Sequence, residues 1–180
     1  MSNSALVSVL IPARNAAPYI EATLHSVSAQ TWPNIEIVVA EDGSSDDTAA
    51  RIQAFSHPQL TLLRGPFGGA AAARNAAFAA SRGDYIQYLD ADDLLAPEKL
   101  ALQLARLVHM QAGAIAFSEW CRFTGTPSAE SLPVMSDWHD YEQPSDWLLS
   151  AWQGQATMPP LAWLTPRPLI EQAGPWDERL

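Results

Sequence analysis

Residues 34–48, NIEIVVAEDGSSDDT, decide the fold, because an apolar run of strand-forming residues changes at once to acidic and small polar residues. The run 34–40 is rich in Ile and Val, which favours a buried strand. The polar residues after it supply a loop and an N-cap for a helix over 48–55. A strand that leads into a helix through a polar loop is the repeating unit of a parallel sheet.

The same unit recurs on both sides of this stretch. Short apolar runs alternate with longer segments that have helical periodicity or are rich in alanine. The predicted fold class is therefore α/β, with a mostly parallel, Rossmann-like sheet flanked by helices. We predict strands over 5–11, 34–40, 60–64, 84–89 and 113–117, and helices over 17–30, 48–55, 70–81 and 97–111.

Length and composition predict a single domain over residues 1–180. A chain of this size buries most of its unfolded surface, and 48% hydrophobic residues are enough for a packed core. The regular alternation ends near Ser118, and tryptophans gather after it, at positions 120, 138, 147, 152, 163 and 176. We therefore distinguish a regular part, 1–118, from an irregular part, 119–180.

Charge and residue usage exclude several classes of protein. The formal charge of −10, from 20 acidic and 10 basic residues, argues against a nucleic-acid partner, since phosphate binding needs clustered Lys and Arg. The single cysteine, Cys121, allows no intrachain disulfide, and no apolar run reaches the ~20 residues of a membrane span. Lys99 is the only lysine and no GK[ST] sequence occurs, which excludes a P-loop. We expect a cytoplasmic protein.

Polar clusters follow three of the predicted strands, at residues 12–15, 41–44 and 90–93. Open parallel sheets bind ligands outside the carboxyl ends of their strands, so these clusters should converge. Helix capping explains each cluster taken alone, and that interpretation stays open. Together they would crowd carboxylates that repel one another unless a cation lies among them, and oxygen ligands without His or Cys favour Mg²⁺ or Mn²⁺. The carboxylates are Asp42, Asp90, Asp92 and Asp93.

These motifs resemble those of the inverting glycosyltransferases of family 2, which have the GT-A fold and use nucleoside diphospho-sugars. Residues 7–15, VSVLIPARN, are similar to the first strand and the Pro-x-x-Asn turn of that family. Residues 26–48 resemble its run from S-x-x-x-Q to D-D-G-S-x-D-x-T, with Glu41 in place of the first Asp. Residues 68–93 resemble the stretch from its A-x-x-R-N helix to its DxD motif.

The resemblance implies a role for each cluster. Asp42 would hydrogen-bond the donor's base, the turn 12–15 would line the nucleoside, and the acids at 90–93 would hold ribose, diphosphate and metal. Arg74 would lie near the phosphates or orient these acids, with a salt bridge in the wall of the site as the alternative. The implied nucleotide-sugar residues are Pro12, Arg14, Asn15, Glu41, Asp42, Arg74, Asp90 and Ala91, and the implied metal ligands are Asp90, Asp92 and Asp93.

The implied reaction is transfer of a sugar from a nucleoside diphospho-sugar, of the UDP or TDP type, to an acceptor hydroxyl with inversion. The acceptor would be a glycan, lipid or protein in polysaccharide or cell-envelope glycan synthesis, which places the enzyme in the cytoplasm, at the inner face of the membrane. Residues 174–178, GPWDE, resemble the family's G-x-F-D-E segment, so the catalytic base is expected beyond Leu180. Residues 1–118 would then bind the donor, and 119–180 would begin an incomplete acceptor-side part.

Several alternatives remain open at this point. Trp163 belongs either to the core or to an acceptor site, since aromatic rings pack well and also stack on sugars. A non-catalytic nucleotide-sugar-binding or assembly module would share the motifs but lack the base. A receiver-like Mg²⁺-binding domain would need a lysine after the fifth strand, where Ser118 follows instead. Uncovered apolar surface also predicts self-association.

Overall fold

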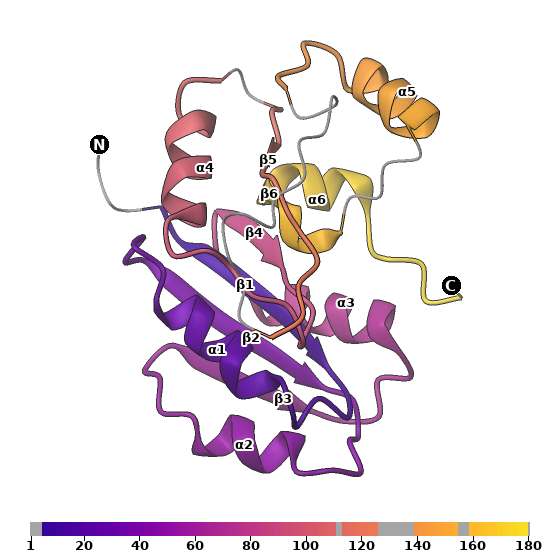
Figure 1. Ribbon diagram of the computed structural model, residues 1–180. Coiled ribbons are helices and arrows are strands. Elements are labelled where there is room, and N and C mark those ends of the chain that lie inside the picture. Colours follow the sequence, from indigo (N-terminus) through magenta and orange to yellow (C-terminus); the bar gives the residue numbers. More distant parts are fainter. Residues whose placement is uncertain (1–4, 111–112, 126–138, 155–158, 180) are drawn as a thin grey trace.

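The computed structural model describes residues 5–110, 113–125, 139–154 and 159–179 (Figure 1). Its centre is a six-stranded sheet in the order β3-β2-β1-β4-β6-β5. The strands are β1 (Val7–Ala13), β2 (Ile35–Glu41), β3 (Leu60–Arg64), β4 (Tyr85–Tyr88), β5 (Ala116–Phe117) and β6 (Trp163–Pro166). The helices are α1 (Ile20–Ser28), α2 (Thr48–Ala54), α3 (Ala70–Ala80), α4 (Lys99–Leu107), α5 (Pro144–Gly154) and α6 (Arg167–Ala173), with a 3₁₀ turn, η2 (Pro160–Ala162).

The predicted α/β class is confirmed. Strands β1 to β4 are parallel, with Val9 of β1 opposite Ile37 of β2 and Gln87 of β4. The bounds of these four strands and of helices α1 to α4 lie within three residues of the predicted ones, except that α4 ends four residues early. The order of the first four strands brings the loops after β1, β2 and β4 to one edge of the sheet, as the motifs require.

The fifth predicted strand differs from the expectation. Only Ala116 and Phe117 form β5, which pairs with β6 rather than with β4. Strand β6 runs antiparallel to both β4 and β5 and separates them. The predicted helix over 97–111 likewise ends at Leu107, and residues 111–112 lie outside the described residues. The left-handed Gly113, with φ 102°, interrupts the predicted strand near its start.

Two apolar layers enclose the sheet, because alternate residues of a strand face opposite sides. Val7, Val9 and Ile11 of β1 pack with the buried faces of α1, α2 and α4. Leu10 faces the other way, toward a smaller layer built by α3 and by Ile170 of α6. In Figure 1 helix α5 lies apart from the sheet, and the yellow C-terminal segment runs from α6 past α3. Among the described residues, every helix is too short or too polar to cross a membrane.

Candidate functional site

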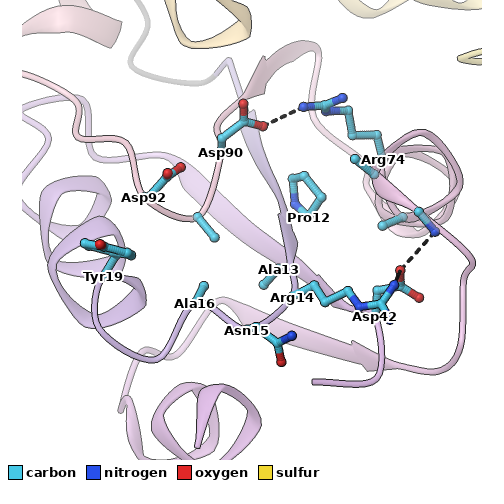
Figure 2. A pocket seen from close by; sticks show the side chains of 14 residues that line it. Pro12, Ala13, Arg14, Asn15, Ala16, Tyr19, Asp42, Arg74, Asp90 and Asp92 are labelled. Carbon is cyan, nitrogen blue, oxygen red and sulfur yellow. Dashed lines mark hydrogen bonds and ion pairs between the residues drawn. The ribbon is translucent and has the colours of Figure 1, made fainter. Parts of the chain in front are cut away.

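A cavity of about 510 Å³ opens at the carboxyl edge of the sheet, among the loops after β1, β2 and β4 and the first turns of α3. Figure 2 shows the side chains that line it, with Asp90 and Asp92 on one side and Asp42 on the other. The structure therefore brings most of the predicted site residues to one place. Those that line the cavity are Pro12, Arg14, Asn15, Asp42, Arg74, Asp90, Ala91 and Asp92.

The loops after β1 and β2 are hydrogen-bonded to each other. Asn15 has a left-handed backbone, φ 49°, which Asn tolerates better than most residues. Its Oδ1 accepts hydrogen bonds from the backbone N–H (2.9 Å) and hydroxyl (3.2 Å) of Ser45, and its own N–H donates to Ser44 Oγ. The next residue, Ala16, donates its N–H to Thr48 Oγ1 at 2.7 Å. These bonds fix the floor of the cavity.

Asp42 organises the turn that leads into α3. Its carboxylate is only 5% exposed, and Oδ1 accepts backbone hydrogen bonds from Phe67 and Gly68, while Oδ2 accepts one from Gly69. Burial alone would raise the pKa of Asp42, but these hydrogen bonds and the nearby Arg14 guanidinium outweigh it and hold that pKa below its usual value. Asp42 is therefore ionised at neutral pH.

Glu41 lies outside this cavity and lines a smaller one beside it, with Arg64. Its side chain is buried and accepts a hydrogen bond from the backbone N–H of Ser44. The second carboxylate oxygen lies 3.5 Å from Arg64 Nε. In this arrangement Glu41 stabilises the loop after β2, and the predicted contact of Glu41 with the nucleotide sugar stays a prediction.

Arg74 and Asp90 form an ion pair in the wall of the cavity. Figure 2 shows Arg74 reaching from α3 to Asp90, whose Oδ1 lies 2.6 Å from Arg74 Nη2. The arginine side chain is only 13% exposed, whereas Asp90 keeps 36% of its side-chain surface. The pair leaves the second carboxylate oxygen of Asp90 available to a ligand. Both interpretations of Arg74, as a phosphate-side residue and as a salt-bridge partner, are compatible with this position.

Asp92 and Asp93 follow in the same loop but face different surroundings. Asp92 is exposed and lines the cavity, whereas Asp93 does not line it. Burial, followed by the negative charges of Asp90 and Asp92, raises the pKa of Asp93 to about 6. The carboxylates of Asp90 and Asp92 thus act on that of Asp93, whereas the sequence prediction grouped all three with Asp42. Asp42 is not among the charges that raise this pKa, and its carboxylate instead accepts hydrogen bonds from the backbone amides of residues 67–69.

The carboxylates suit a divalent cation held jointly with a ligand. In the described part of the chain, no group of three or more His, Cys, Asp or Glu side chains is arranged to hold a metal ion. Mg²⁺ and Mn²⁺ bound with phosphates need only one or two protein carboxylates, and Asp90 and Asp92 both line the cavity. The negative charges of Asp90 and Asp92 help to raise the pKa of Asp93, so this loop concentrates negative charge that a cation would offset. The residues therefore fit such an ion.

Trp163 lies away from this cavity. Its ring packs edge-on against Trp147, with centroids 4.9 Å apart, and tilted against Phe117 at 5.7 Å. It opens strand β6, whose Leu164 is fully buried. These contacts are those of a packing residue, and the acceptor role of Trp163 stays a prediction.

Two contributions to the site were missed from the sequence. Tyr19, just before α1, is 55% exposed and lines the cavity. The available signal was an aromatic residue soon after the first predicted strand, 5–11. Asn75 binds the backbone of Trp176, 101 residues away. Its signal was weaker: Arg74 and Asn75 are the only polar residues of α3, in the sequence AAAARNAAFAA.

The sequence profile of glycosyl transferase family 2 matches residues 8–148. The chain belongs to this family. One relative, the UDP-Glc:alpha-D-GlcNAc-diphosphoundecaprenol beta-1,3-glucosyltransferase WfgD of Escherichia coli, is 38% identical over 104 residues, which make up 57% of this chain and 41% of WfgD.

Two solved structures share the fold. Residues 1–349 of S. aureus TarS in complex with UDP match 97% of this chain and 51% of that chain, with a TM-score of 0.72 and 21% identity. The mannosyltransferase PcManGT from Pyrobaculum calidifontis, in complex with GDP-Man and Mn²⁺, matches 99% of this chain and 50% of that chain, with a TM-score of 0.69 and 23% identity. The fold is thus of the GT-A type, and the chain spans about half the length of these relatives.

Proposed function

We propose that this chain binds the donor of an inverting glycosyltransferase, which transfers a sugar from a nucleoside diphospho-sugar to an acceptor hydroxyl. The observation that carries the proposal is the cavity at the carboxyl edge of the sheet, which gathers Asp42, Arg74, Asp90 and Asp92. Family membership and the ligands named for two relatives of the same fold, UDP and GDP-Man, support it. A receiver-like domain has no comparable support.

The nucleoside would occupy the side of the cavity near Asp42. Oδ2 of Asp42 accepts one backbone hydrogen bond, which leaves acceptor capacity for an N–H of a base such as the uracil of UDP. The ring of Pro12 and the turn up to Asn15 would line the nucleoside. The names of relatives that use UDP-Glc or bind UDP favour a UDP-type donor over the TDP type.

The diphosphate would occupy the opposite side, near Asp90 and Asp92. A divalent cation held by these two carboxylates, Mg²⁺ or Mn²⁺, would neutralise charge on the departing nucleoside diphosphate. Arg74 keeps Asp90 oriented toward the cavity through the 2.6 Å ion pair. Asp93, whose pKa is raised to about 6, would add charge to the cation's surroundings rather than line the cavity.

In the proposed reaction the acceptor oxygen forms a bond to the anomeric carbon of the donor sugar. The bond between that carbon and the diphosphate oxygen breaks at the same time. A base takes the proton of the acceptor hydroxyl. Asp177 and Glu178 are not proposed for that role, because Asp177 pairs with Arg179 at 2.7 Å and Glu178 accepts a hydrogen bond from Asn75. We place the acceptor among cell-envelope glycans and their lipid carriers, on the precedent of WfgD.

The test is calorimetric titration of UDP, GDP and TDP into the protein, with Mn²⁺ and with EDTA. We expect metal-dependent binding of UDP that the substitution Asp92→Ala abolishes, because a cation ligand is lost. Asp146→Asn, which removes an exposed acid from α5, is the matched control and should bind as the unmodified protein does. No binding of any of the three nucleotides would reject the donor site and favour a non-catalytic module.

A further inference from the structure

Two neighbouring residues of α3 hold two different parts of the molecule. Arg74 pairs with Asp90 in the cavity wall. Asn75 instead binds the segment after α6: its Nδ2 donates to the backbone oxygen of Trp176 at 3.0 Å, and its Oδ1 accepts the N–H of Trp176 at 2.8 Å. Nδ2 also donates to Glu178 Oε1 at 2.9 Å. The side-chain amide of Asn75 is thus hydrogen-bonded to both the N–H and the C=O of Trp176.

The ring of Trp176 is fixed against the arginine next to that anchor. The guanidinium carbon of Arg74 lies 4.8 Å from the centre of the Trp176 ring, within the range of a cation–π contact. The same ring meets Tyr88 edge-on, with centroids 5.3 Å apart and planes at 86°. Tyr88 is buried at the end of β4, two residues before Asp90. Trp176 therefore contacts both elements that carry the ion pair.

The guanidinium of Arg74 has few polar contacts other than the one with Asp90. Nη2 contacts a single oxygen of Asp90, and the buried Nε has no hydrogen-bond partner within the described part of the chain. An arginine held by one oxygen can rotate about that bond, whereas a ring against its planar face limits the rotation. The ring of Trp176 thus adds a second restraint to the guanidinium that pairs with Asp90.

We propose that Trp176 is a positioning residue of the donor site, which holds Arg74 against Asp90 and is itself held by Asn75. The segment 174–178, which follows α6, thereby sets the affinity of the cavity for a metal–nucleotide ligand. Coupling between two sites is reciprocal, so a bound metal–nucleotide should also hold Trp176 more firmly on Asn75. This inference rests on the proposed function for its effect on binding, but its effect on Arg74 is a property of the free protein.

The first measurement uses the free protein and no nucleotide. The Nε–Hε signal of Arg74 in ¹⁵N NMR, assigned by its loss in Arg74→Lys, should be shifted by the ring of Trp176 and should exchange slowly with solvent, because Nε is buried. Trp176→Phe keeps an aromatic face and should keep the shift. Trp176→Leu should remove it. An unshifted Arg74 signal, or one that Trp176→Leu leaves unchanged, overturns the proposal.

The second measurement is the affinity for UDP with Mn²⁺. Trp176→Leu should weaken binding about tenfold, the size expected for loss of a partly desolvated cation–π contact, and Trp176→Phe should restore most of it. Asn75→Ala retains both Trp176 and Arg74 but removes the hydrogen bonds that hold Trp176 against Arg74, and should also weaken binding. Trp152→Leu is the matched control, since Trp152 is 72% exposed on α5 and should change nothing.

The outcomes separate this inference from the proposed function. Equal affinity of Trp176→Leu and the unmodified protein for UDP overturns the inference and leaves the proposed function standing. Absence of UDP, GDP and TDP binding in the unmodified protein rejects the proposed function, and the NMR signal of Arg74 then decides the inference alone. Urea unfolding of each variant shows whether a lost affinity reflects a lost fold.

Discussion

At the scale of single residues, Asp42 combines two tasks that its two carboxylate oxygens divide between them. Oδ1 accepts the N–H groups of Phe67 and Gly68, which uses its two lone-pair directions. Oδ2 accepts one backbone N–H, from Gly69, and lies 3.7 Å from Arg14 Nη1, beyond hydrogen-bond distance, so it can accept a further hydrogen bond from a ligand. The residue therefore shapes the turn before α3 and faces the cavity with the remaining acceptor.

The substitution Asp42→Asn should separate shape from acceptor capacity. Asparagine has the same outline but replaces one acceptor oxygen by a donor, so a backbone N–H of residues 67–69 would face an N–H₂ group. Leaving a buried donor unpaired costs about 1–3 kcal/mol, so we expect a loss of unfolding free energy of that order, together with weaker UDP binding. Urea unfolding and calorimetry measure the two effects.

The control for Asp42→Asn is Asp47→Asn, because Asp47 is exposed at the start of α2 and its side chain makes no capping hydrogen bond. We expect this variant to unfold and to bind UDP as the unmodified protein does. If Asp42→Asn behaves like the control in both measurements, the carboxylate neither holds the turn nor receives the base.

At the scale of elements, a buried polar cluster joins β1, β2 and the residues before β4, at the edge of the sheet opposite the cavity. Glu36 of β2 accepts hydrogen bonds from Ser8 Oγ of β1 and from the backbone N–H of Arg82 and Gly83 before β4. Burial would raise the pKa of Glu36, but the hydrogen bonds from Ser8 and Arg82 and the charge of Arg82 outweigh it and lower that pKa. This cluster fixes the register of three strands where they begin.

Gly83 is the residue of this cluster with no room for a side chain. A Cβ atom there would lie 2.4 Å from Ser8 Oγ, 2.6 Å from Ser8 N and 2.9 Å from Leu6 O, and two of these are backbone atoms. We expect Gly83→Ala to lower the unfolding free energy by about 1–3 kcal/mol, as overpacking does. Thermal and urea unfolding measure it.

Gly65→Ala supplies the comparison for Gly83→Ala. A Cβ at Gly65 would meet only Phe67, at an ordinary 3.8 Å, so this variant should retain its stability. Equal stability of the two alanine variants would contradict the close approach of the strands at Gly83. Nucleotide binding of folded Gly83→Ala should be retained, because the cavity lies at the other edge of the sheet.

The elements that could be predicted were those marked by a pattern of neighbouring residues in the sequence. Strand β2 is a run of apolar residues that ends at a polar loop, and the motif acids at 42, 90 and 92 lie at the predicted edge. Strand β6 was not predicted between β4 and β5, because its place depends on pairing of Ile86 with Thr165, 79 residues later. The partners of Asp42 and Asn75 were likewise set by distant segments whose approach no local pattern encodes.

At the scale of the whole molecule, a buried polar network joins the parallel part of the sheet to the segment that carries β6. Lys99 of α4 is only 7% exposed, and its Nζ donates to Gln87 Oε1 at 2.5 Å and to Gln103 Oε1 at 2.6 Å. The two glutamines in turn donate to backbone oxygens of residues 160–162, including Ala162 at 2.9 Å. A neutral amine has two N–H groups, which these two acceptors satisfy.

Burial lowers the pKa of Lys99 to about 7, so the pH dependence of folding should reveal this network. In the unfolded chain the amine has its ordinary pKa of 10.5, so between about pH 7 and pH 10.5 the unfolded chain binds more protons than the folded one. Unfolding free energy should therefore rise with pH across this window, by at most ~1.4 kcal/mol per pH unit, and the gain should be lost as pH falls toward 7.

The variant Lys99→Met should remove this rise, because methionine fills similar volume and does not titrate. Urea unfolding at steps from pH 7 to 9.5 measures the slope, and the difference between the two proteins isolates Lys99 from other titrating groups. Arg106→Met, on the same helix but exposed, controls for the loss of a positive charge and should keep the slope. Parallel slopes for the unmodified protein and Lys99→Met would mean that Lys99 stays protonated in the core. The charge would then be stabilised by the two glutamines, and the segment carrying β6 would be held by an ammonium rather than by a neutral amine.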